Sequence, residues 1–185
     1  MRVTDEIRNY VPGCEQEARD QAQMLRFLCE HPDALDRTCL AGHVTASAWV
    51  VNPARTKVLM AYHRIYDSWA WLGGHADGEE DLRAVALREA QEESGIRHAR
   101  LASEEILSIE TLTVDGHVKR GEWVPSHLHF NVTFLVEADE DETLRACEAE
   151  NKAVRWFAFE DAMRASTEPW MVQHVYRKLA ARTQR

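Results

Sequence analysis

The segment from Gly74 to Ile96, GHADGEEDLRAVALREAQEESGI, constrains this chain more than any other part of its sequence. Leu82, Val85 and Ala86 recur at helical spacing and predict an apolar stripe that faces a core. Acidic residues then continue this stripe toward the C-terminal end of the segment. One face of the expected helix therefore packs inward at one end and carries carboxylates at the other.

The acids on this face are Glu89, Glu92 and Glu93. If they were half-buried ~5.5 Å apart at an effective dielectric constant of about 20, each pair would cost roughly 3 kcal/mol. A divalent cation with oxygen ligands offsets such repulsion, so these residues are candidate metal ligands. A solvated acidic face is the alternative, and the continuation of the apolar stripe argues against it.

Both ends of the segment carry helix-boundary signals. Asp77 and Gly78 precede the expected helix, and the acids at 79–81 are expected in its first turn, near the positive end of the dipole. Gly95 is expected to take the left-handed conformation that closes the helix, with the apolar Ile96 after it.

These residues resemble the Nudix box: a glycine, five residues, a glutamate, seven residues, then Arg-Glu-apolar-any-Glu-Glu-any-Gly-apolar. The pattern is matched without a departure by Gly74, Glu80, Arg88, Glu89, Ala90, Glu92, Glu93, Gly95 and Ile96. A chance match at one starting point has a probability on the order of 10⁻⁸. The flanking strand pattern extends the resemblance to roughly residues 42–159.

The resemblance implies an α/β fold, an α/β/α sandwich with a mixed sheet, and the order of expected elements suits it. Strands are expected at 43–51, 57–62, 69–72, 106–114, 127–137 and 154–159, and helices at 15–30, 160–165 and 170–182. A long polar connection is expected at 115–126. Residues 1–41 are interpreted as an N-terminal helical extension and residues 42–185 as the Nudix hydrolase domain. The extension would pack on the body or contact a second copy in a homodimer, with a lid as the alternative.

The resemblance also implies a hydrolase that cleaves a phosphoanhydride bond in a nucleoside diphosphate linked to another group, with Mg²⁺ or Mn²⁺ as cofactor. Carried over by position, Glu89, Glu92 and Glu93 are the catalytic residues and metal ligands. Glu89 or Glu92 would also act as the base or orient the water. The carbonyl group of Gly74 is expected to join the ligands.

Three further residues of the box are expected to support its structure. Glu80 and Arg88 are expected to form an ion pair across two turns, which would hold the loop on the helix. Gly95 is expected to end the helix.

Many members of the family add an acid from outside the box, often shortly before the last core strand. Glu150 lies six residues ahead of Trp156 and is the candidate for an additional metal ligand. Glu148 and Glu137 are rivals, and a solvated loop acid is the alternative reading.

The candidates for substrate binding are His75, Lys119, Arg120, Trp123, His127 and His129. The basic residues of this set could hold phosphate, and the tryptophan could stack on a base. His127 and His129 share one face of an expected strand. Such a His-x-His pair can also ligate zinc, but the sequence offers no third and fourth ligand at a suitable spacing.

The formal charge of −9 argues against a nucleic-acid polymer as the main partner and leaves room for a small phosphorylated substrate. The four cysteines have no CxxC spacing, so neither a cysteine zinc site nor a disulfide framework is expected. No apolar run approaches 18 residues, and the amino terminus lacks a signal-peptide pattern. We therefore expect a cytoplasmic protein without a membrane partner.

Two other functions remain open. A Nudix fold can serve as a binding module for a nucleotide or nucleotide sugar, although such modules usually lose box acids. An isoprenoid diphosphate isomerase-like enzyme usually carries a disrupted box and a cysteine near the glycine, where this chain has Leu72, Gly73 and Gly74. In the family, a proline or a tyrosine at a set distance after the box marks two groups of substrates. Glu110 and Leu112 occupy that region here, so neither marker is present and the substrate is left open.

Overall fold

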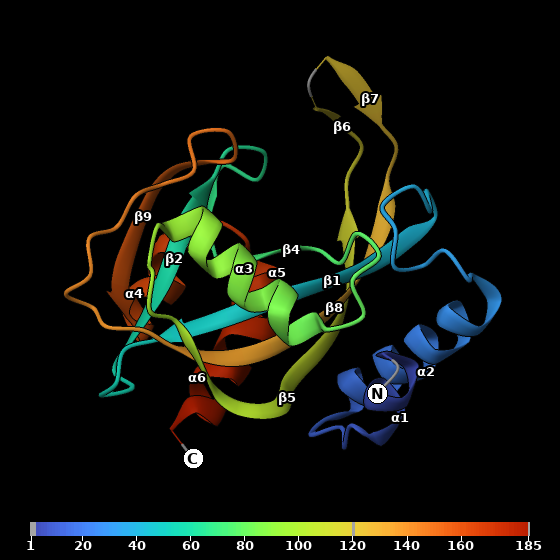
Figure 1. The fold of residues 1–185 in the computed structure, drawn as a ribbon, viewed down its shortest axis with the longest axis horizontal. Coiled ribbons are helices and arrows are strands. Elements are labelled where there is room, and N and C mark those ends of the chain that lie inside the picture. The colour runs from blue at the N-terminus through green and yellow to red at the C-terminus, as the bar shows by residue number, and fades with distance from the viewer. Residues whose placement is uncertain (1–2, 120, 185) are drawn as a thin grey trace.

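The computed structural model describes residues 3–119 and 121–184. The elements in chain order (Figure 1) are α1 (Val3–Asn9), α2 (Glu15–Glu30), β1 (Gly42–Val51), β2 (Lys57–His63), β3 (Ser68–Ala70), β4 (Leu72–His75), α3 (Leu82–Ser94), β5 (Arg100–Val114), β6 (His117–Lys119), β7 (Glu122–Val124), β8 (His127–Glu137), β9 (Asn151–Ala158), α4 (Phe159–Ala165), α5 (Pro169–Met171), the π-helix η1 (Val172–Tyr176) and α6 (Arg177–Thr183). None of the helices among these residues has the length and apolar character needed to cross a lipid bilayer.

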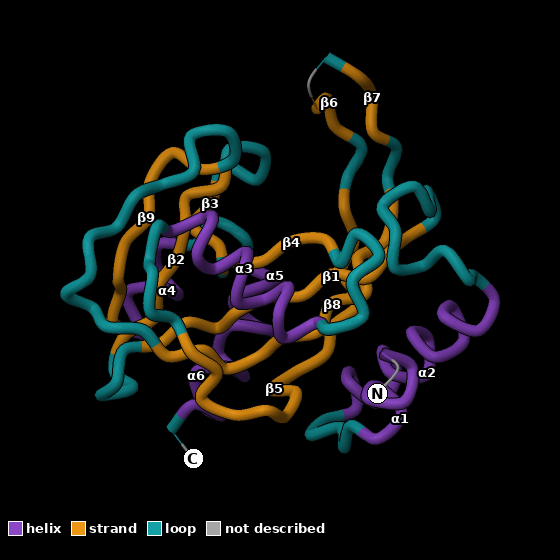
Figure 2. Tube along the Cα trace, in the orientation of Figure 1, coloured by secondary structure: helices purple, strands orange, loops and turns teal. Residues whose placement is uncertain are grey.

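A mixed sheet forms the centre of the molecule (Figures 1 and 2). In the described residues it has seven strands, with the order β3-β2-β1-β8-β5, while β4 pairs with β1 and β9 pairs with β2. β1 and β8 run parallel, in register from Gly42 opposite Leu128 to Val51 opposite Glu137. β4 runs antiparallel to β1 and pairs His75 with Thr45. The first residues of β1 and β8 and the last residue of β4 therefore meet at one end of the sheet.

The side chains of β1 alternate between two layers, as the pleat of a strand requires. Val44 and Val50 join the core cluster that also holds the apolar face of α3. Trp49 and Val51 join the cluster on the opposite face, where Leu179 of α6 packs with residues of α4 and η1. Helices thus cover both faces of the sheet, which confirms the expected α/β/α arrangement.

The N-terminal helices pack against the body of the protein. Ile7 of α1 and Met24 of α2 are fully buried in the cluster that contains α3. The sequence predicts α2 with its observed bounds, but α1 was not expected. A helix of seven residues is too short to be stable alone, and α1 gains its stability by burying Val3 and Ile7.

Several segments differ from the sequence-based expectation. The strand expected at 69–72 is divided into β3 and β4, and the strand expected at 154–159 begins at Asn151 and ends at Ala158 as β9. The connection expected at 115–126 contains the hairpin β6–β7, which projects from the end of the sheet (Figure 1). β5 begins at Arg100 instead of Ile106 and has shifts in its register with β8, so its alternation is broken by bulges. The helix expected at 170–182 contains the π-helical turn η1, and Tyr176 at the end of this turn packs on Trp49 and Trp71.

Candidate active site

The box helix α3 begins three residues later than the sequence suggested. Its first residue is Leu82, and the carboxylate of Asp81 accepts hydrogen bonds from the backbone N–H groups of Arg83 (3.1 Å) and Ala84 (3.3 Å). Asp81 is therefore the N-cap, and the acids at 79–81 precede the helix instead of forming its first turn. Capping explains the difference, because this carboxylate satisfies N–H groups that have no partner within the helix.

Gly95 ends the helix in the left-handed conformation, with φ of 75°. A Cβ atom at this position would also lie 2.9 Å from the Cβ of Arg145. The close of the helix therefore requires glycine for its backbone conformation and for space.

Glu93 is the most deeply buried acid of the box, with 4% of its surface exposed. Its carboxylate accepts hydrogen bonds from the backbone N–H of Gly73 (2.9 Å) and from the side-chain amide of Asn151 (3.2 Å). Burial raises the pKa of Glu93 to about 8; the charges of Glu150 and Glu89 add to this effect, and the two hydrogen bonds oppose it.

Glu89 lies directly against Gly74. A Cβ atom on Gly74 would collide with the Glu89 carboxylate, so the glycine is what allows the strand to approach the helix. Burial raises the pKa of Glu89, while a hydrogen bond of 3.0 Å from Arg88 opposes the shift. The expected pair between Arg88 and Glu80 is not formed: among the described ion pairs Arg88 contacts Glu89, and its guanidinium also lies 3.5 Å from the His75 carbonyl oxygen. Glu80 lies in the exposed loop before the cap.

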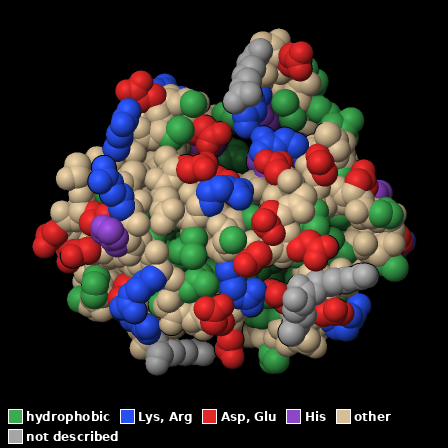
Figure 3. Space-filling model, viewed as in Figure 1, with side chains coloured by type: hydrophobic (Ala, Val, Ile, Leu, Met, Phe, Trp, Pro, Cys, Tyr) green, Lys and Arg blue, Asp and Glu red, His purple; other side chains and the backbone are tan. Residues whose placement is uncertain are grey.

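The acids form one wall of an open cleft. Glu89, Glu92, Glu93 and Glu150 all line this cleft of 760 Å³. Glu92 is exposed on the helix surface, and Glu150 is half-buried in the loop before β9. On the face drawn in Figure 3, acidic and basic side chains surround a hollow in the upper half.

The rivals of Glu150 lie elsewhere. Glu148 is exposed and does not line the cleft; its backbone carbonyl oxygen accepts from Arg64 (3.0 Å). Glu137 ends β8 and pairs with Arg100, whereas the opposite end of β8 faces the site. The structure therefore brings Glu150, and not its rivals, to the acids of the box.

A second cavity of 410 Å³ continues inward from the acids and shares Glu89, Glu93 and Glu150 with the cleft. Of the substrate-binding candidates, those that line it are His75, Lys119, Trp123, His127 and His129. Arg120 lies outside the described residues. Lys119 and Trp123 come from the hairpin β6–β7, where the indole is 69% exposed and covers Gly116.

A set of polar side chains on β1 and β8 that also lines this cavity was not expected from the sequence. Thr45 (3.1 Å) and Ser47 (2.7 Å) of β1 donate hydrogen bonds to the side-chain oxygen of Asn131 on β8. Asn131 donates in turn to Glu110 (3.2 Å) of β5. His43 at the start of β1 was missed as well. The polar positions that alternate along 43–47 were a usable signal, but their meeting with residues 127–133 depends on the parallel pairing of β1 and β8.

The donor chemistry of the acidic site fits a divalent cation. Carboxylate oxygens are ligands that Mg²⁺ and Mn²⁺ prefer, and the backbone of Gly74 lies against the carboxylate of Glu89. Among the described residues, the buried carboxylate of Glu93 forms no ion pair with a basic side chain. The raised pKa of Glu93 reflects a charge that burial disfavours and that no basic side chain compensates, so a bound cation would stabilise its carboxylate form.

Comparison with known proteins agrees with the geometry. Residues 42–179 match the family model described as NUDIX domain, and the chain belongs to this family. No curated protein matches the chain. Members of the family are hydrolases that act on small phosphorylated nucleotide substrates, typically with divalent metals, and the chain is a Nudix-family pyrophosphohydrolase.

Solved structures share the fold at low sequence identity. A Nudix family hydrolase from Clostridium perfringens is 23% identical, with a TM-score of 0.52 over 75% of this chain and 97% of that protein. An Ap4A hydrolase from C. elegans is 22% identical, with a TM-score of 0.54 over 75% and 95%. The E. coli dihydroneopterin triphosphate pyrophosphohydrolase is 16% identical, with a TM-score of 0.54 over 75% and 94%. At these identities the likeness establishes the fold alone.

Proposed function

We propose that this chain hydrolyses a phosphoanhydride bond in a nucleoside diphosphate linked to another group, with Mg²⁺ or Mn²⁺ bound at the acids of α3. The observation that carries the proposal is the buried carboxylate of Glu93, which has no basic partner among the described ion pairs and lines, with Glu89 and Glu150, both the cleft and the cavity of 410 Å³. A non-catalytic binding module would not need this set of carboxylates complete.

In this proposal Glu89, Glu92 and Glu93 hold the metal with the carbonyl group of Gly74, and Glu150 joins them from the loop before β9. When bound, the cation neutralises charge on the diphosphate and lowers the pKa of the attacking water. The hydrogen bonds from Gly73 and Asn151 keep the Glu93 carboxylate turned toward the cleft.

Glu89 and Glu92 differ in how far their carboxylates are held in place by hydrogen bonds, and this bears on which of them accepts a proton. Arg88 fixes one oxygen of Glu89, whereas Glu92 is exposed and unrestrained by a hydrogen bond within the described residues. Either acid could accept the proton of the attacking water, and Glu92 has the greater freedom to do so.

The hairpin β6–β7 supplies the expected substrate contacts. Lys119 would hold a phosphate group, and the exposed indole of Trp123 would stack on a base. Arg120 remains a candidate of the same kind. His75, His127 and His129 line the same cavity and would contact the substrate there.

The test is a panel of nucleoside triphosphates, nucleotide sugars, dinucleotides and capped nucleotides, assayed with Mg²⁺, with Mn²⁺ and with chelator. We expect metal-dependent release of a phosphorylated product from at least one class. Glu92→Gln, at an exposed position, should reduce that release more than tenfold without loss of fold. Binding of a nucleotide without turnover by the metal-loaded protein would favour the binding module. An isomerised diphosphate as product would favour the isomerase.

A further inference from the structure

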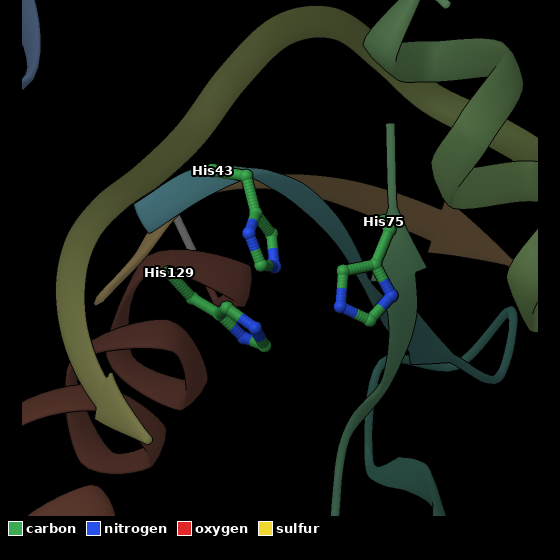
Figure 4. Close-up of side chains that lie close together, drawn as sticks. All are labelled: His43, His75 and His129. Atoms are coloured by element: carbon green, nitrogen blue, oxygen red, sulfur yellow. The ribbon is translucent and has the colours of Figure 1, made fainter. Parts of the chain in front are cut away.

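In the described part of the chain, four histidines from three strands converge at one end of the cavity. His43 lies near the start of β1, His75 ends β4, and His127 and His129 begin β8. The ring centroid of His43 is 4.9 Å from those of the other three, and His75 is 5.1 Å from His129. Figure 4 shows the rings of His43, His75 and His129 directed into a shared space.

Hydrogen bonds from the opposite ring nitrogens orient two of these histidines. Nδ1 of His43 lies 3.3 Å from the Cys39 carbonyl oxygen, and Nδ1 of His127 lies 2.8 Å from the Pro125 carbonyl oxygen. A carbonyl oxygen only accepts, so each Nδ1 carries the proton and each Nε2 presents a lone pair. Backbone carbonyl groups orient histidine ligands of metal ions in this way.

The lone pair of His43 has no partner. Its side chain is 4% exposed, and its Nε2 accepts no hydrogen bond from any described residue. Nε2 of His127 lies 3.2 Å from Nε2 of His129, a separation at which the two atoms share one proton or one cation. A buried acceptor without a donor is uncommon in folded proteins and needs a physical explanation.

The spacing of the nitrogens suits a common ligand. One ring nitrogen from each of His43, His75 and His129 lies within 4.8 Å of the other two. Zn–N bonds of about 2.0–2.1 Å in a tetrahedral site place such atoms about 3.4 Å apart, so small rotations of the rings would complete the site. A metal ion binds histidine as neutral imidazole, so each of the three rings offers one nitrogen lone pair to a shared ion.

We propose that His43, His75 and His129 bind a divalent transition-metal ion, for which Zn²⁺ is the probe, with the fourth coordination position open to the cavity. Water or an anionic oxygen of a bound molecule would take that position. His127 would lie next to the site, because its Nε2 is 3.2 Å from Nε2 of His129. Imidazole nitrogens suit zinc, copper and nickel, whereas the carboxylates of α3 suit magnesium and manganese. One cavity would thus hold two sites of different metal preference, and the histidines would reach substrate through the metal.

The site can be tested on the full chain after removal of metal with chelator. Zn²⁺ is titrated calorimetrically with saturating Mg²⁺ present, so that the box acids are occupied, and Co²⁺ is titrated by visible absorption. We expect one equivalent of Zn²⁺ and the absorption of cobalt bound by nitrogen at low coordination number. In the wild-type chain, the ring ¹⁵N resonances of the three histidines should shift on addition of Zn²⁺.

Matched variants separate this site from other sources of affinity. His75→Gln and His129→Gln should weaken Zn²⁺ binding at least tenfold, whereas His98→Gln, at an exposed position, should leave it unchanged. Glu92→Gln should weaken Mg²⁺ binding and leave Zn²⁺ binding intact. Circular dichroism checks that each variant is folded. The proposal is overturned if wild type binds no Zn²⁺, if the histidine resonances do not move, or if Glu92→Gln removes the Zn²⁺ equivalent.

Discussion

Glu93 and Asn151 form a pair whose geometry predicts how the acid can be replaced. The side-chain nitrogen of Asn151 donates to Glu93, and its oxygen, also buried, has no partner among the described residues. If the amide of Asn151 turns over, that oxygen can accept from a glutamine at position 93. The oxygen of the same glutamine can keep the hydrogen bond from Gly73.

The Glu93→Gln variant should therefore remain folded but lose metal binding and turnover. Removing the charge removes a metal ligand, so turnover should fall more than tenfold and divalent affinity should drop. Thermal melting measures whether the variant is folded, titration calorimetry measures its affinity for the divalent cation, and kcat at saturating Mg²⁺ measures turnover. Unchanged kinetics at saturating Mg²⁺ would contradict the catalytic role of Glu93.

Two neighbouring loop acids provide a matched comparison. Glu150 lines the cleft with the box acids, and Glu148 is exposed outside it. Glu150→Gln should reduce turnover, whereas Glu148→Gln should do little, because only the first carboxylate can reach the metal. Steady-state assays of both variants measure the difference. A larger loss of turnover in Glu148→Gln would assign the role of metal ligand to Glu148. No loss in either variant would mean that both are solvated loop acids.

At the scale of elements, a buried charged network joins α2 to α6. Both carboxylate oxygens of Glu17 accept from the Arg182 guanidinium, at 2.7 and 2.8 Å, and Lys178 Nζ lies 3.0 Å from the same carboxylate. The N–H of Gly13 (2.7 Å) and the hydroxyl of Ser108 (2.8 Å) also donate to it. The N-terminal helices are thus fixed to the body by a charge that is fully buried and fully satisfied.

Arg182→Met should destabilise the protein by about 3–5 kcal/mol, because it leaves the buried Glu17 without its main partner. Urea unfolding at neutral pH measures the loss. The control is Arg177→Met on the same helix, where the side chain is 58% exposed and lies 3.9 Å from Glu160; this change should stay within about 0.5 kcal/mol. Equal effects of the two substitutions would rule out a special role for the network.

The carboxylate of Glu17 also makes the stability of the fold depend on pH in the acidic range. Burial raises the pKa of Glu17, but the hydrogen bonds from Arg182 and Gly13 and the charge of Lys178 outweigh it and lower the pKa to about 2. A depressed folded-state pKa stabilises the fold above the ordinary value of 4.5, and this contribution is lost as pH falls toward 2.

Glu17→Gln should therefore lower stability at pH 6 and flatten its decline between about pH 4.5 and 2, whereas Glu15→Gln, at an exposed position, should follow wild type. Urea midpoints across this range measure the difference. A Glu17→Gln protein whose stability falls as steeply as wild type would show that other acids govern the transition.

At the scale of the whole molecule, metal binding should couple to stability. Glu89, Glu93 and Glu150 face one another only in the folded state, where each charge disfavours the next. A cation that binds only the folded chain stabilises it by about 2.7 kcal/mol at a hundredfold excess over its dissociation constant. Mg²⁺ or Mn²⁺ should therefore raise the melting temperature of wild type, and chelator should lower it where metal co-purifies.

In Glu89→Gln/Glu93→Gln the repulsion is relieved, so the metal-free melting temperature should equal or exceed that of wild type, and the response to Mg²⁺ should disappear. Thermal melts of both proteins, with chelator and with metal, make the comparison. A double variant that melts well below metal-free wild type would mean that these acids are structural partners instead of metal ligands.

The sequence by itself determined the box helix, the order of most strands and the acids that are proposed to form the site. Helical periodicity, a closing glycine and strict spacing are local properties, and Glu89, Glu93 and Gly95 carry them within one segment. The start of the helix was misplaced because Glu79, Glu80 and Asp81 all suit a helix N-terminus, and only the folded backbone selects which one caps it.

Only the tertiary structure decided which distant residues share the cavity. The parallel register of β1 and β8 sets His43 opposite His129, and β4 brings His75 beside them from the other side of β1. No local pattern encodes that register, because it follows from burying both faces of the sheet at once. The same pairing turned a His-x-His motif without further ligands into a cluster of four histidines. The contact of Glu17 on α2 with Arg182 on α6 also joins residues far apart in the sequence, and no local pattern predicts it.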